Sequence, residues 1–124
     1  MKELIVVFIG SGLGGLSRFA LGRWVDNWHT QPFPFGTFVV NLLACFLFGF
    51  IVGLADTKQI LPPTAKLFMT VGFCGGFSTF SSFSSEALSL FQSNYNFALL
   101  LYVVGSVVLC ITATFGGMLL AERM

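Results

Sequence analysis

The segment from Phe35 to Ala55 contains no charged residue, and this feature restricts the possible folds more than any other. A helix needs about 20 apolar residues to cross the hydrocarbon core of a bilayer, and this segment has that length. Of the 124 residues, 56% are hydrophobic and only 9% are charged. A soluble domain has roughly 25% charged residues, because water must solvate its surface. We therefore expect an all-α membrane protein.

Apolar segments of similar length repeat along the chain. They are separated by short polar links, such as the proline-containing DNWHTQPFP that begins at Asp26. This pattern predicts one membrane domain over residues 1–124, with four transmembrane helices at about 4–24, 35–55, 66–91 and 97–121. The basic residues outside the spans favour termini in the cytoplasm by only a small margin.

Several other classes of protein do not fit this composition. The net charge of +1 provides no basic surface for a nucleic-acid partner. The cysteines lie inside apolar segments without a neighbouring histidine, which indicates neither a disulfide framework nor a metal cluster. The stretch GSGLGG, from Gly10 to Gly15, fits a dinucleotide fingerprint, but it lies within an apolar helix, where small residues permit close packing. No nucleophile–base pair is visible, so we do not expect an enzyme.

Polar side chains recur along single helix faces inside the apolar segments. Tyr102, Ser106 and Cys110 are spaced four residues apart in the last segment, and Thr37 and Asn41 share a face in the second. Such groups are costly in lipid and usually face a partner or a water-filled path. Hydrogen bonding between helices is the alternative, but aligned polar residues in several segments favour a pathway.

The stretch GFCGGFSTFSSFSSE, from Gly72 to Glu86, combines glycines, hydroxyls and phenylalanines. Gly75 and Gly76 weaken a helix, and we expect the third helix to break there, with freed carbonyls able to bind a cation. Close helix packing is the alternative. Phe80 and Phe83 lie three residues apart, and their electropositive ring edges could contact an anion. Simple aromatic packing is the alternative for these rings.

Three stretches resemble motifs of the Fluc/CrcB family of fluoride channels. GGFSTFSSFS, from Gly75 to Ser84, is similar to the family's phenylalanine-containing signature. GTFVVN, from Gly36 to Asn41, resembles the second-span motif, and GGLSRF, from Gly14 to Phe19, resembles the first-span motif with its arginine. The resemblance extends over the whole chain.

This resemblance implies an antiparallel homodimer of dual topology, with two fluoride pores built from both subunits and a structural Na⁺ at the dimer centre. It implies that the backbone carbonyls of Gly75 and Ser78 bind the Na⁺. Cys110 stands where the family has a serine, and a thiol is a weaker hydrogen-bond donor. The ion-pathway residues that it implies are Asn41, Phe80, Phe83, Tyr102, Ser106, Cys110 and, near the pore mouth, Glu86.

The function implied is a fluoride-selective channel in the bacterial inner membrane, which exports cytoplasmic fluoride by passive electrodiffusion. The main alternative is a small proton-coupled exporter of the multidrug type. Such exporters need a carboxylate in the first span, and no Asp or Glu lies between Leu4 and Val25. A structural subunit of a larger complex is a third possibility, but it leaves the aligned polar residues without a role.

Overall fold

The computed structural model describes all residues from 1 to 124, and the chain is helical throughout apart from short links. Two stretches are π-helical, with a wider hydrogen-bond repeat than an α-helix. The elements in order are α1 (Lys2–Asp26), α2 (Phe35–Val52), η1 (Gly53–Thr57), α3 (Pro63–Leu67), η2 (Phe68–Cys74), α4 (Gly75–Phe77), α5 (Phe80–Gln92) and α6 (Asn96–Arg123).

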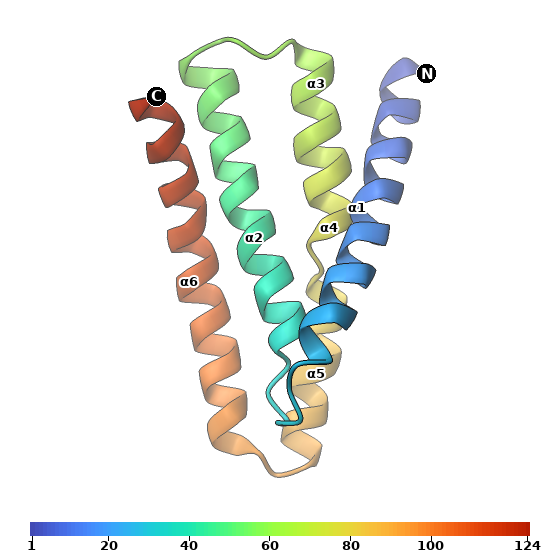
Figure 1. The fold of residues 1–124 in the computed structure, drawn as a ribbon, viewed down its shortest axis with the longest axis vertical. Helices are drawn as coiled ribbons and strands as arrows, with labels where there is room; N and C mark the ends of the chain where they lie inside the picture. The colour runs from blue at the N-terminus through green and yellow to red at the C-terminus, as the bar shows by residue number, and fades with distance from the viewer.

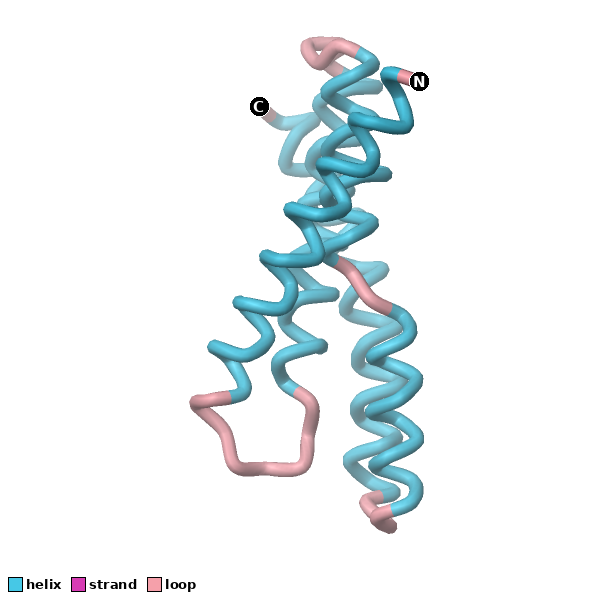
Figure 2. Tube along the Cα trace, turned by 90° about the vertical axis from the view of Figure 1, so that its right-hand side faces the viewer, coloured by secondary structure: helices cyan, strands magenta, loops and turns pink.

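These elements form four helical columns, the third of which runs from α3 to α5 and is bent (Figure 1). Both termini lie at the same end of the molecule, and α2 and α6 run in the same direction side by side. The first column packs along η2 and α4, whereas α5 packs against α6. Figure 2 shows the resulting separation of α5 from α1 below the bend. The bend therefore moves the second half of the third column from one neighbour to the other.

Three helical segments are long and apolar enough to cross a membrane: Lys2–Asp26, Phe35–Thr57 and Asn96–Arg123. The bent third column is made of shorter pieces and does not meet this measure. Large apolar side chains point outward along the helices, as Phe8 does with 78% exposure and Leu16 with 70%. A continuous apolar exterior of this kind suits lipid and not water. The protein is thus a multi-pass membrane protein, and its division into four spans stays a prediction.

Small side chains let the columns approach closely around a limited core. The buried residues Val40, Ala44 and Phe77 form that core, with Leu21 and Phe73 packed on it. Gly49 of α2 lies directly on the backbone of Thr114 in α6, where a Cβ atom would collide with the Thr114 carbonyl. Close backbone approach through small residues is a common basis of helix packing in membranes.

The position predicted for the helix break is wrong by about one turn. Gly75 is helical, with φ −63° and ψ −40°, and the glycine pair lies inside the helical stretch that ends at Phe77. The break lies at Ser78 and Thr79, whose backbones are extended. A packing requirement explains Gly76, because a Cβ there would collide with the Ser11 carbonyl of α1. The alternative interpretation of the glycine pair, close packing, is therefore correct for Gly76.

Candidate functional site: a polar route beside the helix break

The break in the third column is held by a side chain from α2. The Thr79 backbone N–H donates to Asn41 Oδ1 at 2.7 Å, and Asn41 Nδ2 donates to the Thr79 carbonyl at 3.0 Å. The Thr79 hydroxyl in turn accepts from the backbone N–H of Ser82 at 3.1 Å and caps the start of α5. The break is therefore stabilised by two polar side chains, one of them distant in sequence.

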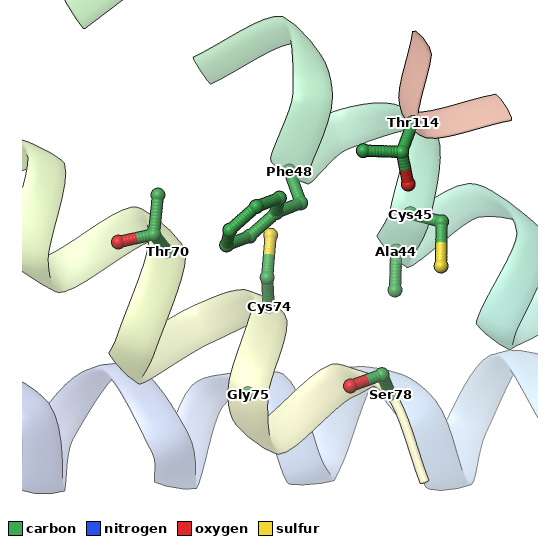
Figure 3. Close-up of a pocket in the computed structure, with 8 residues that line it drawn as sticks. All are labelled: Ala44, Cys45, Phe48, Thr70, Cys74, Gly75, Ser78 and Thr114. Atoms are coloured by element: carbon green, nitrogen blue, oxygen red, sulfur yellow. The ribbon is translucent and has the colours of Figure 1, made fainter. Parts of the chain in front are cut away.

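These bonds leave backbone carbonyls without their helical donors. In a continuous α-helix, the N–H groups of Thr79 and Ser82 would donate to the carbonyls of Gly75 and Ser78, four residues earlier. Asn41 and the Thr79 hydroxyl take up those N–H groups instead. Gly75 and Ser78 both line a cavity of about 250 Å³, together with Ala44, Cys45, Phe48, Thr70, Cys74 and Thr114 (Figure 3). Irregular backbone at membrane depth is tolerated only against protein or a polar cavity.

Polar residues of α2 and α6 pair in a regular register, because the two helices run parallel. Thr37 and Tyr102 meet at the Glu86 carboxylate. One helical turn further on, Asn41 and Ser106 line one cavity, and after the next turn Cys45 and Cys110 line the same cavity. Gly49 and Thr114 continue the same register. We call these four pairs the α2–α6 ladder.

A cavity of about 340 Å³ runs along the two middle pairs of the ladder. It joins three parts of the molecule: the polar face of α2, the polar face of α6 and the start of α5. The residues that line it are Asn41, Cys45, Ser78, Thr79, Phe80, Phe83, Ser106, Val107, Cys110 and Ile111. Of the seven residues predicted to form the ion pathway, this cavity includes five; Tyr102 and Glu86 lie outside it.

Ser106 presents an unusual hydroxyl group to this cavity. The residue is 7% exposed, and its Oγ atom is buried without a hydrogen-bond partner. An unpaired buried hydroxyl costs roughly 1–3 kcal/mol, so native proteins seldom keep one without a reason. A hydroxyl can donate to an anion. Ser106 thus brings one unpartnered donor to the wall of this cavity.

The two predicted pore phenylalanines lie at the same cavity. The ring centroids of Phe80 and Phe83 are 5.4 Å apart, and Phe83 lies 4.9 Å from the Tyr102 ring. Phe80 is 78% exposed in the single chain, although it lines the cavity. One side of this cavity is therefore open in the isolated subunit.

Glu86 and Tyr102 form a hydrogen-bonded group beside the cavity. Glu86 accepts from Thr37 Oγ1 at 2.6 Å and from the Tyr102 hydroxyl at 3.2 Å. The proton of the fully buried Tyr102 is thus directed at the carboxylate and not at the cavity. Glu86 also lines a smaller cavity of about 150 Å³ with Pro32, Pro34, Ser89, Leu90, Ser93 and Tyr95. It therefore lies between the ladder and the end of the molecule that carries the α1–α2 link.

Sequence reasoning assigned no role to Arg18, but the structure places it at the break. Its Nε atom donates to the Gly76 carbonyl at 3.1 Å, and it lines a cavity of about 150 Å³ that also contains Arg23, Thr79 and Ser82. A lone charge within an apolar span usually marks a functional position, and that signal was visible in the sequence. Arg18 brings a positive charge to the side of the break that faces α1.

The sequence is similar to known proteins over almost its whole length. A profile of the family described as "CrcB-like protein, Camphor Resistance (CrcB)" matches residues 5–118. The fluoride-specific ion channel FluC of Azobacteroides pseudotrichonymphae is 39% identical over 122 residues, which cover 98% of each chain. The FluC protein of Flavobacterium psychrophilum is 35% identical over 124 residues, the full length of both. That of Phocaeicola vulgatus is 39% identical over 122 residues, which cover 98% of this chain and all of the relative.

A bent helix, paired residues on two parallel helices and an apolar exterior define a small helical membrane protein with a cavity beside the helix break. Such an arrangement is typical of membrane channels. Full-length similarity makes the assignment specific: the chain belongs to the CrcB family, which includes the FluC fluoride channels.

Proposed function

We infer that this protein is a fluoride-specific ion channel that lets fluoride leave the cytoplasm by passive electrodiffusion. The observation that carries this inference is the unpaired hydroxyl of Ser106, a residue that lines one cavity with Phe80 and Phe83. Neutral donors and ring edges attract a small anion without the strong trapping that a fixed cation would cause. The family membership supports the same inference.

In this proposal the anion moves along the α2–α6 ladder, and each residue has a separate task. Asn41 uses one Nδ2 hydrogen on Thr79, and its second one is free to contact the anion. Ser106 donates its hydroxyl, and Cys110 continues the line of donors with a weaker S–H group. Phe80 and Phe83 present ring edges. Glu86 holds the Tyr102 hydroxyl in place at the mouth.

The working unit that we propose is an antiparallel homodimer in the bacterial inner membrane, inserted in both orientations, with two pores. Support comes from the open side of the cavity, where Phe80 is 78% exposed in one chain. A second subunit packed on that side would close the path. A polar route with one wall open to lipid could not carry an ion, because ions are costly in hydrocarbon.

We also propose that the carbonyls of Gly75 and Ser78 bind a structural Na⁺ at the dimer centre. The donor set fits, because both residues line one cavity and their helical N–H partners are used elsewhere. Neutral carbonyl oxygens are suitable ligands for an alkali cation. A bound Na⁺ supplies a positive charge and joins the two subunits. Arg18 binds the intervening Gly76 carbonyl, which fixes the end of the helical stretch that precedes the break.

Fluoride efflux from liposomes that contain only the purified protein tests the function. We expect rapid electrogenic release of fluoride when a potassium ionophore balances the charge, and no release of chloride under the same gradient. Protein-free liposomes and liposomes with the Phe80→Ile/Phe83→Ile protein serve as controls. Equal release of chloride and fluoride, or fluoride release no faster than in protein-free liposomes, would contradict the proposal.

A further inference from the structure

We propose that Cys45 and Cys110 form a two-thiol site for soft metal cations, and that a cation bound there closes the anion route. The pair is the third of the α2–α6 ladder, one turn beyond Asn41 and Ser106. Both side chains line the cavity that Phe80 and Phe83 also line. Both thiols are free and partly exposed.

The register of the helices places these sulfur atoms together. The collision that any side chain at Gly49 would make with Thr114 shows that α2 and α6 touch at that level. Cys45 and Cys110 lie one turn before those residues on each helix. Parallel helices keep the same register from turn to turn, so the two cysteines lie at one height on neighbouring helices and line one cavity.

The third cysteine does not complete this site. Cys74 is buried, and it lines the other cavity, next to Gly75. Figure 3 shows the Cys74 sulfur beside the Phe48 ring, with the Cys45 sulfur turned away from it. Cys45 also lines that cavity, whereas Cys74 does not line the cavity that Cys45 and Cys110 share, so Cys74 provides a nearby control thiol.

A second feature of this cavity is an unpartnered hydrogen-bond donor near the two thiols. The Ser106 hydroxyl, one turn away, is more than nine-tenths buried and has no partner. The cavity that both thiols line has a volume of about 340 Å³, which is large enough for a bare cation. The site is thus accessible along the same route that we propose for the anion.

The chemistry of two opposed thiols suits soft cations that prefer two ligands. Thiolates select soft metals, and the thiolate is the form that binds. When one Hg²⁺ binds, two S–H bonds break, two protons leave and two Hg–S bonds form, with no change of oxidation state. The product is neutral and occupies the third pair of the ladder. It replaces a weak donor with a bulky group that offers no hydrogen bond to an anion.

Hg²⁺ alone is the probe for this site, and the blocking effect rests on the proposed channel function. Fluoride efflux from liposomes is measured over a range of Hg²⁺ concentrations, each variant being compared with its own flux without metal. We expect Cys45→Ser and Cys110→Ser each to need about 100-fold more Hg²⁺ for half-inhibition, because one of two linked ligands is lost. Cys74→Ser should be inhibited like the wild type. An excess of a small dithiol should restore flux in the wild type.

The number of mercury ions bound per chain, measured on the purified protein in detergent, tests this proposal independently of the proposed channel function. The Cys74→Ser protein should retain one tightly bound mercury per chain, and the variant that also lacks Cys45 and Cys110 should retain none. This result would support the site even if the protein released no fluoride. Unchanged inhibition in the Cys45→Ser/Cys110→Ser protein would overturn the proposal, as would loss of inhibition in Cys74→Ser alone.

Discussion

Asn41 and Thr79, which belong to different helices, make a reciprocal pair of hydrogen bonds. The Asn41 side chain donates to the Thr79 carbonyl at 3.0 Å and accepts from its N–H at 2.7 Å. One amide thereby replaces both backbone partners that Thr79 would have in a continuous helix. The same amide lines the cavity of the proposed route, so the break and the route depend on one side chain.

Asn41→Asp should abolish fluoride flux. A carboxylate cannot donate to the Thr79 carbonyl and places a negative charge beside it, at the point where an anion must pass. We expect efflux at neutral pH to fall to the level of protein-free liposomes. Asn41→Gln, which keeps the amide but lengthens the side chain, is the matched control and should keep more flux than Asn41→Asp. Wild-type flux in Asn41→Asp would place Asn41 outside the route.

Replacement of either pore phenylalanine by an aliphatic residue should reduce flux strongly. Phe80→Ile and Phe83→Ile retain apolar volume but remove the electropositive ring edge, an interaction worth about 1 kcal/mol or more. We expect each variant to lose about tenfold in flux, which corresponds to about 1.4 kcal/mol, while it still purifies as a folded dimer. Phe48→Ile, on the other cavity, is the control. Full flux in both pore variants would remove the ring edges from the mechanism.

Ser106→Ala should separate function from stability. The Ser106 hydroxyl has no hydrogen-bond partner, so its removal breaks no bond and should leave the thermal unfolding midpoint unchanged or slightly higher. Flux should fall, but less than in the phenylalanine variants, because one donor of several is lost. Cys110→Ser should be tolerated or mildly increase flux, since a hydroxyl is the stronger donor. A destabilised Ser106→Ala protein with normal flux would show that the hydroxyl serves the fold alone.

Gly76→Ala should destabilise the protein, because its Cβ would collide with the Ser11 carbonyl of α1. The backbone on both sides is helical, so neither helix can move aside without loss of packing. We expect a cost of about 1–3 kcal/mol, measured as a lower thermal midpoint in detergent. Gly12→Ala is the matched control, since Gly12 follows Ser11 and a Cβ there meets nothing. Equal midpoints for the two variants would mean that the close approach is not required.

Some features of this molecule could be predicted from the sequence alone, for physical reasons. Long hydrophobic segments predict helices directly, because a backbone in lipid must form its hydrogen bonds within the protein. The four-residue spacing of Tyr102, Ser106 and Cys110 places them on one face of a helix. The break was misplaced at Gly75 because local helix propensity suggested it, whereas hydrogen bonds from the distant Asn41 set its position at Thr79. The π-helical turns η1 and η2 also had no signal in the sequence. The position of Arg18, a charge within an apolar segment, was a visible sign of a special role. Its hydrogen bond to the Gly76 carbonyl was nevertheless not predicted.

The constant register of α2 and α6 restricts how chains of this kind can change in length. Removal of one residue from the middle of either helix would rotate everything beyond it by about 100° and turn each later partner away from its counterpart. Asn41 would then no longer lie opposite Ser106, nor Cys45 opposite Cys110. We therefore expect natural insertions and deletions to collect in the links near Gln31, Ile60 and Asn94, and engineered fusions to be accepted only there.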